Sequence, residues 1–316
     1  MKLKQILLAR EILGNIVPQS RVVRARSLSE PSGANVFLFL ENEGPIGTFK
    51  LRGAYYTLHQ RMQKSKIHGV VTASSGNHGL AIAYAAKLLG MPARVYLPVG
   101  VNPAKRARIV QQCAEVVEAG AFVEESRDQA ANFARESGWL NIFDGQDDGL
   151  TIGAATIGIE IIEQVPTADV IWVPIGDSTL IRGVAFAAKY LRRDVRVIGV
   201  QAERAPAYYL SFHAGRALST DFSDTVADGL AVRETHEDNV RELVKLVDDI
   251  QLVSDDEMLR ALRHLLLEEH VLAEPAAAAS TAAFVKTDGS FSGKNVVLVV
   301  SGANISEEHL RRALPG

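Results

Sequence analysis

Short runs of apolar residues, many of them β-branched, alternate along the chain with longer alanine-rich stretches in which apolar and polar positions are mixed. Runs that are apolar at every position are typical of parallel strands covered on both faces. Strands are therefore predicted at residues 36–41, 69–73, 94–97, 170–174, 195–201, 250–253 and 295–300.

The stretches between these runs have the spacing of apolar residues that is typical of helices. Helices are predicted at residues 79–89, 103–112, 127–136, 157–164, 180–191 and 255–270. Gly90 would end the first helix in a left-handed conformation, and Ser254 with Glu257 forms a capping box before the last. Strands that alternate with helices along the whole chain indicate an α/β fold, with mainly parallel, twisted sheets and helices on both faces.

The composition narrows the class of protein. The chain has 316 residues, of which 47% are apolar, and its net charge of -3 comes without a basic stripe. It is therefore expected to bind no nucleic acid, and its short, interrupted apolar runs predict no membrane span. The single cysteine, Cys113, excludes a disulfide within the chain and a zinc site built from cysteines, which favours a cytoplasmic location.

A glycine–proline turn leads into a lysine with an aromatic neighbour, because residues 44–54 read G-P-I-G-T-F-K-L-R-G-A. Apolar surroundings and the charge of Arg52 would disfavour an ammonium on Lys50. A neutral lysine amine is the nucleophile that forms imines. The alternative is an ordinary solvated lysine at the start of a helix.

Residues 72–79, which read T-A-S-S-G-N-H-G, join a buried strand to an apolar helix. Such a turn presents backbone N–H groups and side-chain donors to an anion or a ring oxygen. The alternative is an ordinary N-cap made by Ser75 or Asn77.

Residues 173–183, V-P-I-G-D-S-T-L-I-R-G, again have the order strand, polar loop, helix. The backbone N–H groups of this loop and the hydroxyls of Ser178 and Thr179 can cradle a phosphate. The Asp177 carboxylate would repel a phosphate unless it points away. The alternative is a helix that Asp177 or Ser178 caps.

Residues 297–304, V-L-V-V-S-G-A-N, end a buried strand in a turn of small residues. Ligands of open α/β sheets bind at the carboxyl ends of the strands, which is where Ser301 is expected. The alternative is a simple turn.

Together, and in this order, these four segments resemble the threonine dehydratase and serine racemase group of pyridoxal phosphate enzymes, which have the tryptophan synthase β-like fold. The family shows T-G-S-F-K-x-R-G-A, S-S-G-N-H-G, a glycine-rich phosphate loop and S-G-G/A-N, and residues 225–232 and 274–277 match it as well. The resemblance implies two subdomains. The large one would comprise residues 1–68 and 147–316, and the small one residues 69–146 with a smaller parallel sheet.

The resemblance also implies a role for each matching residue. Lys50 would carry pyridoxal 5′-phosphate as a Schiff base and act as the base at Cα, while Ser75 would act on the opposite face in a racemase. The implied cofactor-binding residues are Phe49, Lys50, Asn77, Gly176, Asp177, Ser178, Thr179, Leu180 and Ser301. The implied substrate-binding residues are Ser74, Ser75, Gly76, His78 and Arg127.

Several positions depart from the family pattern. The phosphate loop usually has four glycines, whereas residues 176–179 read G-D-S-T. Gln201 and Ala207 stand where some relatives have acidic ligands of a divalent cation, so that no metal is predicted. These departures widen the range of conceivable substrates to a 3-hydroxyaspartate or an aryl-serine.

The activity implied is that of a lyase, which converts a small β-hydroxy amino acid such as threonine or serine to a 2-oxo acid and ammonia. A racemase that uses Lys50 and Ser75 is an alternative, and so is a protein that kept the fold and lost catalysis. The family also implies a homodimer.

Overall fold

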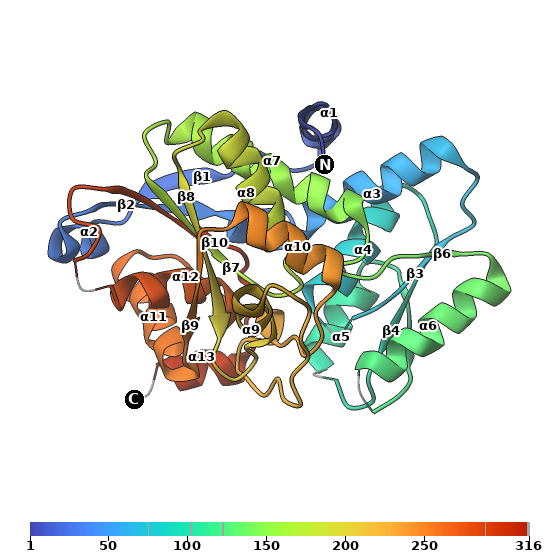
Figure 1. The fold of residues 1–316 in the computed structure, drawn as a ribbon. Helices are drawn as coiled ribbons and strands as arrows, with labels where there is room; N and C mark the ends of the chain where they lie inside the picture. The colour runs from blue at the N-terminus through green and yellow to red at the C-terminus, as the bar shows by residue number, and fades with distance from the viewer. Residues whose placement is uncertain (75, 102, 122, 288, 315–316) are drawn as a thin grey trace.

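The computed structural model describes residues 1–74, 76–101, 103–121, 123–287 and 289–314, and in this part of the chain two sheets lie side by side (Figure 1). The larger sheet has the strand order β1-β2-β10-β7-β8-β9, and only its edge pair β1–β2 is antiparallel. Its strands are β1 Arg21–Arg24, β2 Asn35–Leu40, β7 Val170–Pro174, β8 Arg196–Ala202, β9 Asp249–Val253 and β10 Asn295–Val300. The predicted α/β class with mainly parallel sheets is confirmed.

The smaller sheet is parallel throughout and has the order β5-β4-β3-β6. Its strands are β3 Val70–Ala73, β4 Ala93–Leu97, β5 Glu115–Glu118 and β6 Leu140–Asn141. All of them fall within residues 70–141, and the division into a small domain (69–146) and a discontinuous large domain stays a prediction.

Helices cover both faces of the larger sheet, as Figure 1 shows. The helices of one face are α2 Arg26–Ser32, α11 Asp255–Glu268, α12 Pro275–Val285 and α13 Glu307–Ala313, and those of the other are α7 Asp148–Gln164, α8 Thr179–Leu191, α9 Ala207–Ala214 and α10 Glu237–Leu246. Alternate residues of β7 enter the two cores. Trp172 packs with the first group of helices, whereas Ile171 and Val173 pack with the second.

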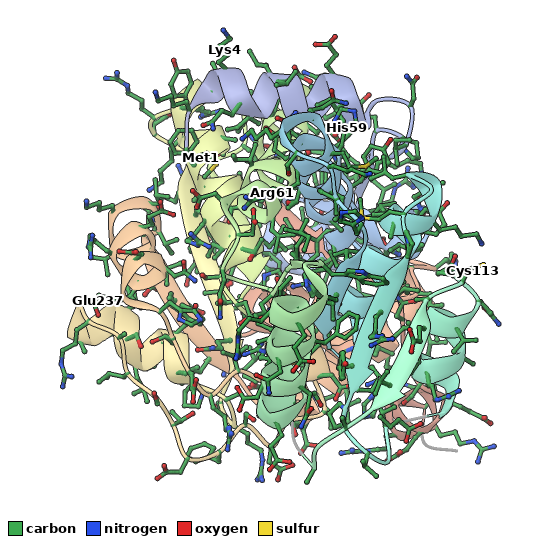
Figure 2. All side chains as sticks on the ribbon, turned by 90° about the vertical axis from the view of Figure 1, so that its right-hand side faces the viewer. Met1, Lys4, His59, Arg61, Cys113 and Glu237 are labelled. Atoms are coloured by element: carbon green, nitrogen blue, oxygen red, sulfur yellow. The ribbon has the colours of Figure 1, made fainter. Side chains whose placement is uncertain are left out.

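The smaller sheet is covered in the same way. Its helices are α4 Asn77–Leu88, α5 Pro103–Val110 and α6 Val123–Ser137. The helix α3, Lys50–Lys64, packs against both α4 and α7 and therefore bridges the two halves. The helix α1, Leu3–Leu13, lies on the outside of α7 with Lys4 pointing away from the body, and Cys113 lies at the surface just after α5 (Figure 2). Two short 3₁₀ turns, η1 Glu41–Glu43 and η2 Asp228–Leu230, complete the described elements.

The predicted capping box and the predicted glycine at a helix end are both confirmed. Ser254 and Glu257 form the reciprocal capping box, and Gly90 has a φ of +64°. Several predicted boundaries are wrong. Glu41 lies outside β2 in a 3₁₀ turn, the helix predicted from residue 127 begins at Val123, and the helix predicted from residue 157 begins at Asp148. Tertiary packing on α3 overrides the low helix propensity of the glycines in that first part of α7.

Two glycines allow α3 and α7 to cross in backbone contact. A Cβ added at Gly53 would lie 2.6 Å from the carbonyl oxygen of Leu150, and one added at Gly153 would lie 2.6 Å from the Cα of Gly53. Larger residues would push the two helices apart. This close approach fixes the first turn of α3, which carries Lys50, against the body of the protein.

Within the described residues, no helix is long and apolar enough to cross a bilayer.

Candidate active site

A pocket of about 340 Å³ lies where carboxyl ends of strands from both sheets meet. Its size is that of a site for a small cofactor. The sequence-predicted residues that line it are Phe49, Lys50, Ser74, Gly76, Asn77, His78, Arg127, Gly176, Asp177, Ser178, Thr179, Leu180 and Ser301. Ser75, predicted as both catalytic and substrate-binding, lies outside the described residues. The structure therefore brings together every predicted site residue that it describes.

The lysine segment is attached directly to the end of β10. Thr48 and Gly302 form an isolated antiparallel bridge, and the Phe49 N–H donates to the Ser301 carbonyl at 3.1 Å. This connection places Lys50 at the start of α3, inside the pocket, with its side chain 17% exposed. The Lys50 Nζ lies 5.1 Å from the centroid of the Phe49 ring, within the range of a cation–π contact.

The ammonium of Lys50 forms an ion pair with Asp144, which follows β6. Asp144 also lies 3.9 Å from Nδ1 of His78, whose Nε2 contacts the carbonyl of Ile142 at 3.2 Å. Burial lowers the pKa of His78, so that the ring is neutral at physiological pH and donates to that carbonyl. Burial by itself would raise the pKa of Asp144, but the charge of Lys50 and its hydrogen bond hold the pKa below its ordinary value.

The Asp177 carboxyl lies against that of Asp144, within hydrogen-bonding reach. Gly145 permits this approach, because its φ is +77° and an added Cβ would lie only 3.0 Å from the Cβ of Asp177. Burial and the neighbouring Asp144 charge raise the pKa of Asp177 to about 6. Asp177 thus points toward the lysine and not away from the pocket.

The loop between β7 and α8 is suited to a phosphate. The N-terminus of α8 has no side-chain cap, and Ser178 there takes a left-handed conformation with a φ of +64°. The Thr179 hydroxyl is buried without a hydrogen-bond partner among the described residues. The Ser178 hydroxyl accepts from Arg182 Nε at 3.1 Å. Free helix-terminal N–H groups beside an unsatisfied buried hydroxyl are what an anion such as a phosphate would satisfy.

Asn77 begins α4 and is held from two sides. Its Nδ2 donates to Glu274 at 2.7 Å, and its Oδ1 accepts from Asn304 at 2.7 Å. Burial raises the pKa of Glu274 to about 7, against the effect of the hydrogen bond from Asn77. The alternative in which Asn77 serves only as the N-cap of this helix is wrong, because the N-cap is Gly76 and has no side-chain bond.

Arg127 comes from α6 and reaches the same pocket. Its Nε is buried without a hydrogen-bond partner among the described residues. A guanidinium with an unsatisfied donor in a ligand-sized pocket is suited to a carboxylate.

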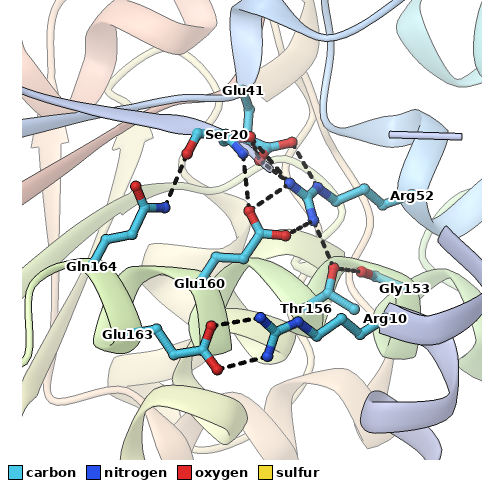
Figure 3. Close-up of polar contacts among 9 residues, drawn as sticks. All are labelled: Arg10, Ser20, Glu41, Arg52, Gly153, Thr156, Glu160, Glu163 and Gln164. Atoms are coloured by element: carbon cyan, nitrogen blue, oxygen red, sulfur yellow. Dashed lines mark hydrogen bonds and ion pairs between the residues drawn. The ribbon is translucent and has the colours of Figure 1, made fainter. Parts of the chain in front are cut away.

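Behind the lysine, a buried network fixes the first turn of α3 (Figure 3). The Arg52 side chain is 2% exposed and donates to Glu41 at 2.8 and 3.0 Å and to Glu160 at 2.5 and 3.0 Å. It also donates to the hydroxyls of Ser20 and Thr156, each at 3.0 Å. Burial disfavours the charge, but the two carboxylates raise the pKa of Arg52 above its ordinary value. The network joins α3, α7 and the segment around β1 and β2 two residues from Lys50.

The pocket residues that the sequence did not predict as site residues include Asp144, Glu274, Asn304 and Arg108. Glu274 and Asn304 lie within segments that carry the family resemblance, but they have no chemical signal of their own. Asp144 follows a strand of only two residues, which is too short for a pattern. An acidic residue before Gly145, in N-I-F-D-G, was the only available signal.

Comparison with known proteins agrees with this geometry. Residues 15–302 match the family model described as "Pyridoxal-phosphate dependent enzyme". The L-threonine ammonia-lyase of Thermotoga maritima is 34% identical over 313 residues, which span 99% of this chain and 78% of that protein. The catabolic L-threonine dehydratase of Escherichia coli K12 is 32% identical over 302 residues, 95% of this chain and 92% of that one. The structure of maize serine racemase superposes with a TM-score of 0.92 at 28% identity, over 99% and 96% of the two chains.

The chain therefore belongs to the family of pyridoxal-phosphate dependent enzymes, and its cofactor is pyridoxal phosphate.

Proposed function

We propose that this enzyme eliminates water from a small β-hydroxy amino acid such as L-threonine or L-serine, which yields a 2-oxo acid and ammonia. The observation that carries the proposal is the position of Lys50, which lies mostly buried in a pocket that is also lined by the 176–180 loop and by the candidate carboxylate-binding residues Ser74 and Arg127. Relatives named as threonine ammonia-lyase and dehydratase, at 34% and 32% identity, support this reaction.

The chain's own residues fit the cofactor. Gly176 to Leu180 would hold its phosphate, with the Thr179 hydroxyl gaining the partner that it lacks. Phe49 would pack beside the ring and Ser301 would face the ring nitrogen. When bound, pyridoxal phosphate supplies an electron sink for negative charge at the Cα of an amino acid.

Lys50 would bind the cofactor aldehyde, and its amine, once the amino group of the substrate has displaced it, would take the proton from Cα. Lys50 forms an ion pair with Asp144, so its side chain must leave Asp144 before the amine can bind the aldehyde. Arg127, Ser74 to His78 and the N-terminus of α4 would orient the substrate carboxylate. The hydroxyl would then leave Cβ as water with the proton that Lys50 has taken from Cα, and the released enamine would hydrolyse to the oxo acid and ammonia.

Incubation of the purified, cofactor-loaded chain with each enantiomer of threonine and serine tests the proposal. Formation of 2-oxo acid and ammonia in equal amounts supports it, and Lys50→Ala is expected to abolish the product. Conversion to the other enantiomer without 2-oxo acid would instead support a racemase. The similarity to maize serine racemase favours this alternative. If no β-hydroxy amino acid yields a 2-oxo acid or the opposite enantiomer, both the lyase and the racemase are excluded.

We also infer, from the family alone, a homodimer in the cytoplasm. Sedimentation equilibrium of the purified chain tests the dimer, since it separates one from two copies of a 34.2 kDa chain.

A further inference from the structure

A row of four polar side chains crosses the wall of the pocket. Arg108 on α5 donates from Nη1 to Oδ1 of Asn304, which follows β10, at 2.7 Å. Asn304 Nδ2 donates to Oδ1 of Asn77 at 2.7 Å, and Asn77 Nδ2 donates to Oε1 of Glu274 at 2.7 Å. All four residues line the pocket. Two lie on helices that cover the smaller sheet, and two lie in loops beside the larger sheet.

The direction of these hydrogen bonds is fixed by chemistry. A guanidinium only donates, so the amide atom that faces it must be the oxygen. A peptide carbonyl only accepts, so the amide atom that faces it must be the nitrogen. Arg108 faces the oxygen of the Asn304 amide. The carbonyls of Ile46 and Gly47 face its nitrogen at 3.0 and 3.4 Å. The amide of Asn304 therefore has one orientation, without the ambiguity that usually attends asparagine side chains.

The orientation of the Asn304 amide determines that of the Asn77 amide. Because Asn304 presents its N–H to Asn77, the Oδ1 of Asn77 is occupied as an acceptor. The Nδ2 of Asn77 then carries two hydrogens, one toward Glu274 and a second that is free to serve the pocket. If the Asn77 amide turned over, its nitrogen would face the nitrogen of the Asn304 amide, donor against donor, and any anionic ligand atom beside it would lose a donor.

We propose that Asn304, whose own amide is oriented by the Ile46 and Gly47 carbonyls, is a positioning residue that fixes the Asn77 amide so that a donor faces the ring oxygen of the cofactor. This inference rests on the proposed function and on the cofactor-binding role that the family resemblance implies for Asn77, a hydrogen bond from its side chain to the ring oxygen of the cofactor. Arg108 is the outer member of the row, because the Ile46 and Gly47 carbonyls hold the Asn304 amide even without it.

The substitution Asn304→Asp tests the direction of the hydrogen bonds in the row. Both oxygens of an aspartate accept, so Asn77 must turn and donate to the new carboxylate. The cofactor-loaded variant is expected to lose a donor to the ring oxygen. Its visible absorbance maximum should move toward the shorter wavelength of the protonated oxygen, and its affinity for pyridoxal phosphate should fall tenfold to a hundredfold, a range of about 1.4–2.7 kcal/mol.

Arg108→Met is the matched control, since it removes the outer partner and leaves the two carbonyls in place. It should keep the wild-type absorbance maximum. A purely structural role of Asn304 would lower the melting temperature of Asn304→Asp without moving the maximum, and that result would overturn the inference. If Asn304→Asp does not fold, Asn304→Leu replaces it, and a spectrum like that of the wild type is again the contradicting result.

The two proposals fail separately. A wild-type protein that forms 2-oxo acid, with an Asn304→Asp spectrum that is unchanged, removes the positioning role alone. A wild-type protein that takes up the cofactor at Lys50 and yields no 2-oxo acid removes the proposed reaction alone.

Discussion

The backbone N–H of Phe49 donates to the carbonyl of Ser301 at 3.1 Å, and this bond joins two segments from opposite ends of the chain. It sets the lysine that follows Phe49 beside the carboxyl end of β10, where ligands of open α/β sheets bind. The neighbouring bridge between Thr48 and Gly302 makes the connection rigid. The position of Lys50 is thus a property of the sheet as much as of its own helix.

The buried network around Arg52 is expected to stabilise the whole fold. Arg52→Met leaves Glu41 and Glu160 as buried carboxylates without a cation and should lower the free energy of unfolding by about 3–5 kcal/mol. Urea denaturation followed by circular dichroism measures it. A more exposed ion pair, which Figure 3 also shows, provides the matched control.

That control is the bidentate pair of Arg10 and Glu163, whose side chains are 40% and 42% exposed. Arg10→Met should cost only about 0–1 kcal/mol, because water screens the pair. Equal losses in the two variants would contradict the role assigned to burial.

Asp177 should weaken the binding of the cofactor phosphate, because a carboxylate of raised pKa, about 6, is still ionised at pH 8. Asp177→Gly restores the usual glycine and should raise the affinity for pyridoxine 5′-phosphate about tenfold at pH 8, which is about 1.4 kcal/mol. This ligand has no aldehyde and cannot react with Lys50. Calorimetry measures the affinity.

Two comparisons make that test specific. Pyridoxine without its phosphate should bind both proteins equally, and the gain should shrink at pH 5, where Asp177 is mostly protonated. Asp194→Gly, far along the chain and exposed, should leave both affinities unchanged. A gain that is the same at both pH values would rule out the charge as the cause.

Glu274 should make stability fall as the pH rises. Its pKa is about 7 in the folded protein and about 4.5 when unfolded, so the folded state holds the extra proton between these values. The contribution is fully present below pH 4.5 and is lost as the pH rises to 7, and it amounts to at most about 3 kcal/mol. Glu274→Gln should remove that part of the slope. Denaturation midpoints at pH 5 and pH 7.5 measure it, and parallel curves for the two proteins would refute it.

The sequence predicted the apolar strands well, because strands such as β7 and β10 are buried on both faces and have no polar interruptions. It missed β1 and β5, whose four residues are half-buried with charged ends, and β6, which has two residues. Short edge strands are defined by their partners and not by their own pattern. The same holds for the start of α7, where packing against α3 decides the boundary.

The sequence predicted those site residues that stand in recognisable turns between a strand and a helix. Lys50, Asn77 and the 176–180 loop stand in turns at strand–helix junctions, and they meet in one pocket. The contacts between Asp144 and Lys50 and between Asn304 and Asn77 join segments far apart in the chain. Which polar side chain faces which is fixed by how the two sheets are placed, and no local pattern records that.

The central claim is that the amine of Lys50 holds the cofactor. Reduction with borohydride makes permanent the bond between a protein amine and a bound aldehyde, and peptide mapping by mass spectrometry then locates it. The account predicts one pyridoxyl label per chain, on the peptide that contains Lys50, and none in Lys50→Ala. A label on another lysine, or no label on the cofactor-loaded wild type, would contradict it.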